Sequence, residues 1–185
     1  THHDHIQGLP FFKPAYMSYC TLHIYGPELL GQDLRESLSQ IMAPKYCPVR
    51  LEEMNSEKVI VNLGETDRLV FQESGFAPHH LNGHAPPREI ENSDLLVTTM
   101  RSYAHPKDGV FIFKVSMNGK KVVFATDVEG YTGGDSRLIR FAQDADVLIH
   151  DAQYEESEYV DPVHPKQGFG HSTIDMACEV AQKAN

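Results

Sequence analysis

Apolar segments that end on acidic residues fill the stretch from residue 110 to residue 151, and this pattern constrains the fold more than any other part of the sequence. Three strands are predicted there, at residues 110–115, 121–125 and 147–150. The dipeptide Asn118-Gly119 between the first two is typical of a two-residue hairpin turn. Asp127 follows the second strand and Asp151 the third, and Asp135 is placed to cap a helix between them. Strands that alternate with a helix in this way predict an α/β sandwich.

Residues 21–72 continue the alternation of strands and helices. Strands are predicted near residues 21–25, at 58–63 and at 68–72. Pro27 is predicted to be the first residue of an amphipathic helix, because leucines recur after it at three- and four-residue spacing. That helix is expected to end before Pro44.

Two later segments complete the outline. Residues 75–91 contain three prolines, two glycines and three histidines, and we predict a long surface loop there. The last segment is predicted to be a helix, because its apolar residues form a stripe at helical spacing. Ser172 and Asp175 have the spacing of a capping box, which places the start of this helix near Ser172.

The composition is that of a folded protein without a membrane span. Hydrophobic residues make up 41% and charged residues 23% of the chain, and no apolar run approaches the roughly 20 residues needed to cross a bilayer. The formal net charge of −10 argues against a nonspecific nucleic-acid binder. A small anionic substrate stays open, because bound metal ions can reverse the local potential. Cys20, Cys47 and Cys178 are far apart and form no CxxC pair, which fits a reducing compartment and a cytoplasmic location.

A compact cluster of metal-ligating residues begins the chain. His2, Asp4 and His5 place two imidazoles and a carboxylate within four residues, with His3 among them. Such a set suits Zn²⁺, Mn²⁺ or Fe²⁺ better than soft copper. The alternative is a remnant of a purification tag. A tag, however, would not supply the Gly-Leu-Pro sequence at residues 8–10.

Further chemistry-bearing residues follow predicted strands or start the last helix. Asp127 lies where α/β proteins tend to place their sites, although a turn cap is an equally good interpretation of a strand-end aspartate. His105 lies in a loop, where most histidines have no special function. His150 and Asp151 end the third strand. His171 lies at a helix start, where backbone N–H groups can hold an anion and an imidazole can carry a proton.

In order and spacing these segments resemble the metallo-β-lactamase superfamily, and within it the phosphodiesterase branch with ribonuclease Z-like and cyclic-nucleotide-phosphodiesterase-like proteins. The resemblance covers almost the whole chain. Its most specific part is the His/Asp cluster followed by Gly-Leu-Pro-Phe-Phe at residues 8–12, and Gly-His-Ser-Thr at residues 170–173 supports the phosphodiesterase side. The fold implied is an α/β, metallo-β-lactamase-type αββα sandwich, incomplete here, in a single domain over residues 1–185.

The resemblance also implies a set of metal ligands. The family signature is His-x-His-x-Asp-His, whose last three ligands match His2, Asp4 and His5. His105 resembles the next ligand, and Asp127 resembles the carboxylate shared by both metals. Two divalent metal ions are therefore implied, Zn²⁺ first, with Mn²⁺ or Fe²⁺ as alternatives.

Two further ligands of the family have no counterpart in this sequence. The first His of the signature would precede residue 1, and the family's final ligand His would follow residue 185. The family's opening strands have no counterpart either. We therefore expect this chain to be an internal portion of a longer protein, in which each metal lacks one protein ligand and metal binding is weakened.

The resemblance implies hydrolysis of a small phosphodiester by a hydroxide held between the two metals. Asp4 and Asp127 would orient this nucleophile. His171 would donate a proton to the leaving alkoxide or contact a phosphate oxygen. His150 and Asp151 are expected to steer a coordinated imidazole rather than bind metal.

Two alternatives to the phosphodiesterase stay open. One is a thioesterase or lactonase of the same fold, which would share the metal site but have no use for His171. The other is a noncatalytic fragment whose metal site is incomplete. No membrane partner is expected, nucleic acid is not indicated by the charge, and a homodimer stays open.

Overall fold

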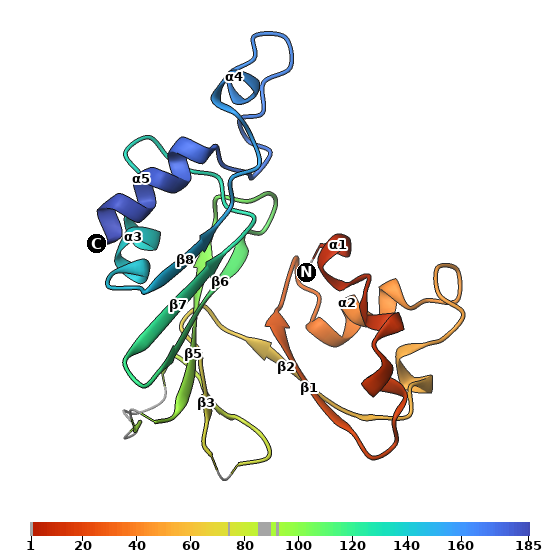
Figure 1. Ribbon diagram of the computed structural model, residues 1–185. Helices are drawn as coiled ribbons and strands as arrows, with labels where there is room; N and C mark the ends of the chain where they lie inside the picture. The colour runs from red at the N-terminus through yellow and green to blue at the C-terminus, as the bar shows by residue number, and fades with distance from the viewer. Residues whose placement is uncertain (1, 74, 85–89, 92) are drawn as a thin grey trace. The chain divides into compact units, whose positions relative to one another are not determined.

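A computed structural model describes residues 2–73, 75–84, 90–91 and 93–185 of the chain (Figure 1). Backbone contacts divide the chain into an N-terminal unit, Thr1–Leu63, and a C-terminal unit, Gly64–Asn185. The assignment of a single domain to residues 1–185 stays a prediction. In the part of the chain that the structure describes, no helix is both long and apolar enough to cross a bilayer.

The N-terminal unit is a two-stranded parallel sheet packed with short helices. Its elements are α1 (His3–Ile6), η1 (Leu9–Phe11), η2 (Lys13–Tyr16), β1 (Thr21–Pro27), α2 (Leu34–Ile41), η3 (Leu51–Glu53) and β2 (Glu57–Leu63). β1 and β2 pair in register from Thr21 with Glu57 to Pro27 with Leu63. One buried apolar cluster forms its core: Ala15, Leu34, Leu38, Met42, Cys47, Leu51 and Met54.

The predicted helix start at Pro27 is wrong. Strand β1 continues through Pro27, and helix α2 begins only at Leu34. Between them the chain turns, with Leu29 and Gln32 exchanging backbone hydrogen bonds of 3.0 and 2.9 Å. Asp33 then caps the helix, because its carboxylate accepts the backbone N–H of Glu36 at 2.7 Å. The spacing of the leucines correctly predicted a helix, but the helix begins after the Asp33 cap and not at Pro27.

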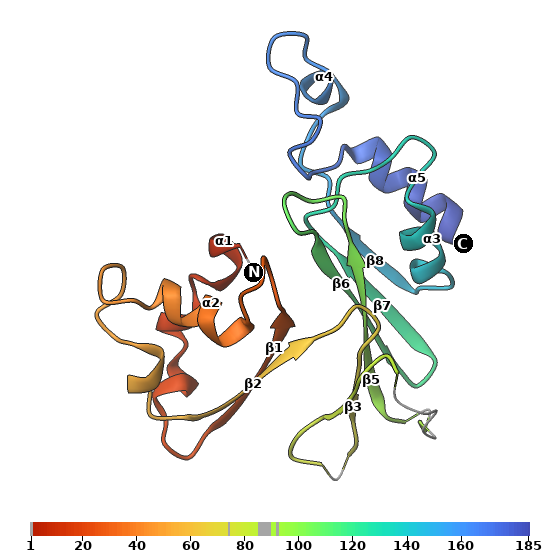
Figure 2. The same cartoon turned by 180° about the vertical axis from the view of Figure 1, so that it is seen from behind.

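A six-stranded sheet forms the C-terminal unit, and both views of the molecule show it (Figures 1 and 2). Its strands are β3 (Arg68–Phe71), β4 (His79–Leu81), β5 (Leu95–Ser102), β6 (Val110–Met117), β7 (Lys120–Ala125) and β8 (Val147–His150). Their order is β4-β3-β5-β6-β7-β8, and only the pairing of β7 with β8 is parallel. The hairpin at Asn118-Gly119 is confirmed, since both residues have the positive φ that a type I′ turn needs.

Two strands of this sheet correct the sequence analysis. Part of the segment 75–91, predicted to be a loop, pairs with β3 as strand β4, while residues 85–89 of that prediction lie outside the described residues. Strand β5 was not predicted, although it pairs on both sides, with β3 and with β6. Its Thr99 is buried and donates its hydroxyl to backbone oxygens of Gly64 and Asp67.

Helices α3 (Ser136–Ala142) and α5 (Ile174–Ala184) lie beside each other along the sheet (Figures 1 and 2), while α4 (Glu156–Tyr159) is a single turn in the connection after β8. The sheet, α3 and α5 contribute the core of this unit, together with Val128: Met100, Ile112, Val123, Ala125, Val128, Leu138, Ala142, Val180 and Ala184. The predicted cap at Asp135 is confirmed. The cap of α5 is Thr173 instead of Ser172, whose buried hydroxyl donates to the Val128 carbonyl at 2.5 Å. The predicted α/β class is thus confirmed.

Candidate functional site

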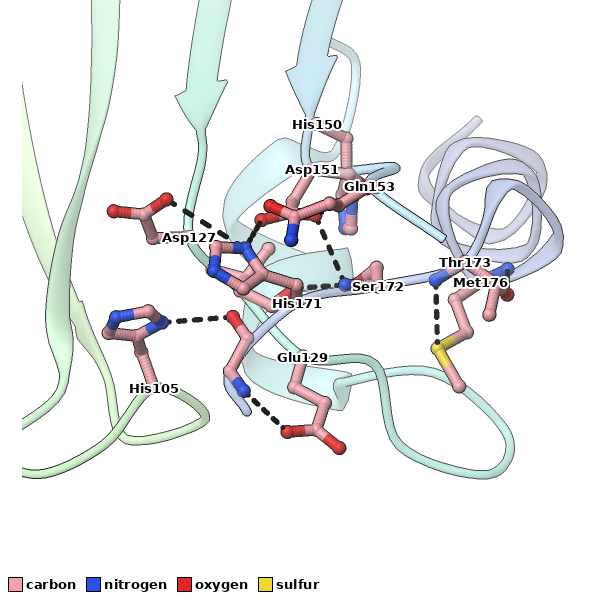
Figure 3. Close-up of polar contacts among 12 residues, drawn as sticks. His105, Asp127, Glu129, His150, Asp151, Gln153, His171, Ser172, Thr173 and Met176 are labelled. Carbon is pink, nitrogen blue, oxygen red and sulfur yellow. Dashed lines mark hydrogen bonds and ion pairs between the residues drawn. The ribbon is translucent and has the colours of Figure 1, made fainter. Parts of the chain in front are cut away.

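His105 lies in the loop between β5 and β6 and is only 7% exposed. Its Nδ1 lies 2.9 Å from the carbonyl oxygen of Gly170 (Figure 3). A carbonyl oxygen can only accept, so Nδ1 carries the proton and the lone pair of the neutral ring is on Nε2. The loop closes on itself through a 3.0 Å bond from the Gly109 N–H to the His105 carbonyl. A neutral histidine that is protonated on Nδ1 is the tautomer that binds a metal through Nε2.

Asp127 is the second residue after β7, in a backbone conformation that few residues adopt. Its φ is +54°, in the left-handed region. Such a conformation costs on the order of 1–3 kcal/mol and is tolerated best by Gly, Asn and Asp. Because β7 and β8 are parallel, with Ala125 opposite His150, the residues that follow both strands come to the same edge of the sheet. Asp127 and Asp151 meet there.

Asp151 and His171 form the tightest side-chain pair of this edge. His171 Nδ1 donates to one Asp151 oxygen at 2.7 Å, and the backbone N–H of Ser172 donates to the other at 3.1 Å (Figure 3). Asp151 is 8% exposed. Asp127 lies beyond the pair, with its Oδ1 4.0 Å from the same nitrogen. The His105 ring meets the His171 ring edge to face, with 5.3 Å between centroids.

Asp127, Asp151 and His171 have ligand atoms within 4.8 Å of one another, so their fit to a metal can be judged. Donor atoms on one tetrahedral zinc lie about 3.3 Å apart, given bonds of about 2.0–2.1 Å. The 2.7 Å separation of His171 Nδ1 from Asp151 is shorter and is that of a hydrogen bond. Asp151 therefore orients His171, and the ligand roles of His105 and Asp127 stay predictions.

The other predicted ligands lie in the N-terminal unit. His2 precedes α1, and Asp4 and His5 belong to it. All three are exposed, and His5 Nε2 lies 3.3 Å from an Asp4 oxygen. A single helical turn thus gathers two imidazoles and a carboxylate, a donor set suited to zinc.

The predicted site residues therefore form two groups. His2, Asp4 and His5 come together in the N-terminal unit, and His105, Asp127 and His171 come together in the C-terminal unit. That the two groups bind the same metal ions stays a prediction.

Sequence reasoning placed Asp151 beside a coordinated imidazole, whereas its partner is His171. His150 donates Nδ1 to the Asp151 carbonyl at 2.7 Å, and its buried Nε2 has no hydrogen-bond partner among the described residues. Glu129 was missed. It accepts hydrogen bonds from the backbone N–H groups of Gly168 and Gly170. Its position two residues after Asp127, in the loop that follows β7, was the available signal.

Comparison with solved structures identifies the fold. The metallo-β-lactamase fold protein YhfI from Bacillus subtilis superposes with a TM-score of 0.55 at 17% identity, over 99% of this chain and 56% of its own. The short form of human tRNase Z superposes with a TM-score of 0.53 at 20% identity, over 90% of this chain and 57% of its own. The chain thus spans a little over half the length of these neighbours. The predicted metallo-β-lactamase-type fold is confirmed.

Sequence comparison points to the same group of proteins. No curated protein matches the chain. The model of the family described as Beta-lactamase superfamily domain matches residues 1–185, the full length given. The superfamily consists mostly of hydrolytic enzymes, and its members typically bind divalent metals. The chain belongs to this family of the metallo-β-lactamase superfamily.

Proposed function

We propose that this chain carries metal ligands and the proton donor, His171, of a metal-dependent phosphodiesterase. The observation that carries the proposal is the hydrogen bond from His171 Nδ1 to the buried carboxylate of Asp151. Family membership supports a hydrolase, and the held imidazole beside Asp127 favours a reaction whose leaving group needs a proton.

Two divalent metals, Zn²⁺ first, would be held by His2, Asp4, His5, His105 and Asp127. When bound they supply Lewis acidity toward the phosphoryl group and a water molecule acidic enough to attack it at neutral pH. His105 is prepared for this role, because its bond to Gly170 leaves the lone pair on Nε2.

His171 acts on the leaving group. Asp151 fixes the ring through Nδ1, so Nε2 is the nitrogen that exchanges a proton with the substrate. In its protonated form the imidazole donates the Nε2 proton to the departing alkoxide. The Nδ1 proton stays on the ring, hydrogen-bonded to Asp151, throughout. The second Asp151 oxygen is held by the Ser172 N–H, so the carboxylate cannot rotate away.

The substrate that fits the charge of the chain is small. A net charge of −10 repels a long polyanion, whereas a compact diester needs a favourable potential only at the metals. We therefore propose a small phosphodiester with an alkoxide leaving group.

A leaving-group comparison tests the proton donor. Wild type and His171→Gln are loaded with Zn²⁺ or Mn²⁺ and assayed on two diesters, one with an alkyl and one with a 4-nitrophenyl leaving group. General acid catalysis contributes about 10²–10⁴-fold, and mainly where the leaving group is a strong base. The variant should therefore lose about that factor in kcat on the alkyl diester and far less on the nitrophenyl diester.

A thioester substrate and a metal analysis complete the design. Equal losses on both diesters would remove His171 as the acid, and wild-type turnover of the thioester alone would replace the phosphodiesterase with a thioesterase. Elemental analysis of the loaded chain should find at least one metal per molecule. Well under one would rule out an enzyme made of this chain alone.

A further inference from the structure

Glu129 lies below His171 in the view of Figure 3 and accepts three hydrogen bonds. One carboxylate oxygen accepts the Gly168 N–H at 2.7 Å and the Tyr159 hydroxyl at 2.6 Å. The other accepts the Gly170 N–H at 2.9 Å. Three donors hold this half-buried carboxylate in one orientation, because each charge-assisted hydrogen bond is stronger than a neutral one.

Gly170 links this carboxylate to His105. Its N–H is bound by Glu129, and its carbonyl oxygen accepts Nδ1–H of His105. The contact between Gly170 and the ring is close. A Cβ on residue 170 would lie 2.2 Å from His105 Nδ1, and φ there is +91°. Only glycine lets the backbone approach the imidazole in this way.

Tyr159 is the side-chain donor among the three that bond to Glu129. Burial raises the pKa of the phenol, and the hydrogen bond to Glu129 raises it further. The hydroxyl therefore stays a donor throughout the neutral range. Tyr159 is itself 7% exposed, so the bond is shielded from water.

We propose that Glu129 is a positioning residue: it holds residues 168–170 so that the Gly170 carbonyl fixes His105 as the Nδ1–H tautomer, whose lone pair lies on Nε2. Glu129 itself contacts neither metal nor substrate. The inference rests on the proposed function only where it treats His105 as a ligand, since the tautomer is a property of the chain without metal.

The tautomer can be measured directly. Chain labelled with ¹⁵N-histidine, in the presence of a chelator, is examined by long-range ¹H–¹⁵N NMR, and the His105 signals are assigned by their loss in His105→Gln. Wild type should show a protonated Nδ1 and an unprotonated Nε2. In Glu129→Ala the pattern should change to the mixture of tautomers of an unrestrained imidazole.

Three variants keep the test sharp. Glu129→Gln preserves the shape but offers one oxygen for the two backbone donors, so an intermediate pattern is expected. Tyr159→Phe removes one donor and leaves both backbone bonds, so His105 should keep its tautomer. Glu179→Gln, a half-exposed acid paired with Lys183 on α5, serves as the matched control and should change nothing.

Zinc affinity gives the second readout. Losing such a supporting residue weakens metal binding about 10–100-fold, so Glu129→Ala and, less strongly, Glu129→Gln should bind zinc more weakly than Tyr159→Phe. A wild-type tautomer together with wild-type zinc affinity in Glu129→Gln and Glu129→Ala overturns the proposal. If wild type hydrolyses no diester but the tautomer changes as expected, only the proposed function fails.

Discussion

The N-terminal unit presents its predicted ligands on the surface, whereas the C-terminal unit holds its own inside a hydrogen-bond network. His2, Asp4 and His5 are exposed around a four-residue helix without a buried residue. His105 and Asp151 are buried, and backbone groups fix both. Backbone hydrogen bonds within the C-terminal unit thus already fix the geometry of the second group. Under the proposed function, the C-terminal unit should therefore determine the geometry of the chemistry.

Removing the Asp127 carboxylate should have the largest effect. A metal pair contributes several kcal/mol of transition-state stabilisation, so Asp127→Ala should lower kcat/KM by about a thousandfold or more, at about 1.4 kcal/mol per factor of ten. Asp175→Ala, an exposed acid at the start of α5, is the control. Steady-state kinetics on the alkyl diester measure the effect. Turnover within tenfold of wild type would remove Asp127 from the site.

Truncation of one core leucine in each unit tests whether the units are held by separate cores. Leu138 in α3 and Leu34 in α2 are 2% and 1% exposed. Each Leu→Ala change should cost about 2–5 kcal/mol, and hydrogen exchange should show the loss mainly in the unit that carries the change. If Leu138→Ala deprotects the N-terminal unit as strongly as its own, the two-unit description is wrong.

A methyl group at residue 170 should disturb the hydrogen bonds of this residue with His105 and Glu129 without removing any functional side chain. The positive φ alone costs roughly 1–2 kcal/mol for alanine, and the added Cβ would meet the His105 ring. Gly170→Ala should therefore lower the unfolding midpoint in urea and also weaken zinc binding. Gly133→Ala, at φ +85° with no atom within 4 Å of its Cβ, controls for strain alone. Equal zinc affinities in the two variants would contradict the close contact.

The smallest expected effect concerns Asp67, a buried carboxylate in the C-terminal unit. Burial alone would raise the pKa of Asp67, but hydrogen bonds from the Gly64 N–H, the His80 ring and the Gly83 N–H outweigh it and hold the pKa below its usual value. A lowered folded-state pKa stabilises the protein above the unfolded value, near 3.9, and this contribution is lost as pH falls through the folded pKa.

Asp67→Asn should accordingly cost about 1 kcal/mol at pH 7, the difference between a charge-assisted and a neutral hydrogen bond. The difference in the free energy of unfolding between wild type and variant should shrink below about pH 4. Urea unfolding at pH 7 and at pH 3 measures it, with Asp175→Asn as the exposed control. A gap that is the same at both pH values would show that Asp67 carries no lowered pKa.

Local signals predicted much of the fold. The Asn118-Gly119 turn and the Asp135 cap depend on a few adjacent residues and were correct. Strand β5 depends on its neighbours instead. Its Thr99 is polar and buried because it bonds backbone groups more than 30 positions away, so no alternation of polar and apolar residues marks the strand. The start of α2 was misplaced because the choice between Pro27 and Asp33 depends on the strand that precedes it.

In the candidate site too, local signals indicated some residues and missed another. Asp127 and His171 were proposed because they lie close to the end or the start of an element, and His105 because it precedes the strand that begins at Val110. The structure places both His105 and Asp127 near His171. Glu129 was missed, because its partners are the backbone N–H groups of Gly168 and Gly170, which any residue could offer. Side chains that bind backbone across a loop leave little pattern in a sequence.

Crystals of the zinc-loaded chain, measured at the zinc absorption edge, test the central claim most directly. Anomalous difference density should locate zinc on His105 Nε2 and Asp127, with His2, Asp4 or His5 completing its ligands and Asp151 still bonded to His171. Zinc bound by the N-terminal cluster alone, with neither His105 nor Asp127 among its ligands, would contradict the account.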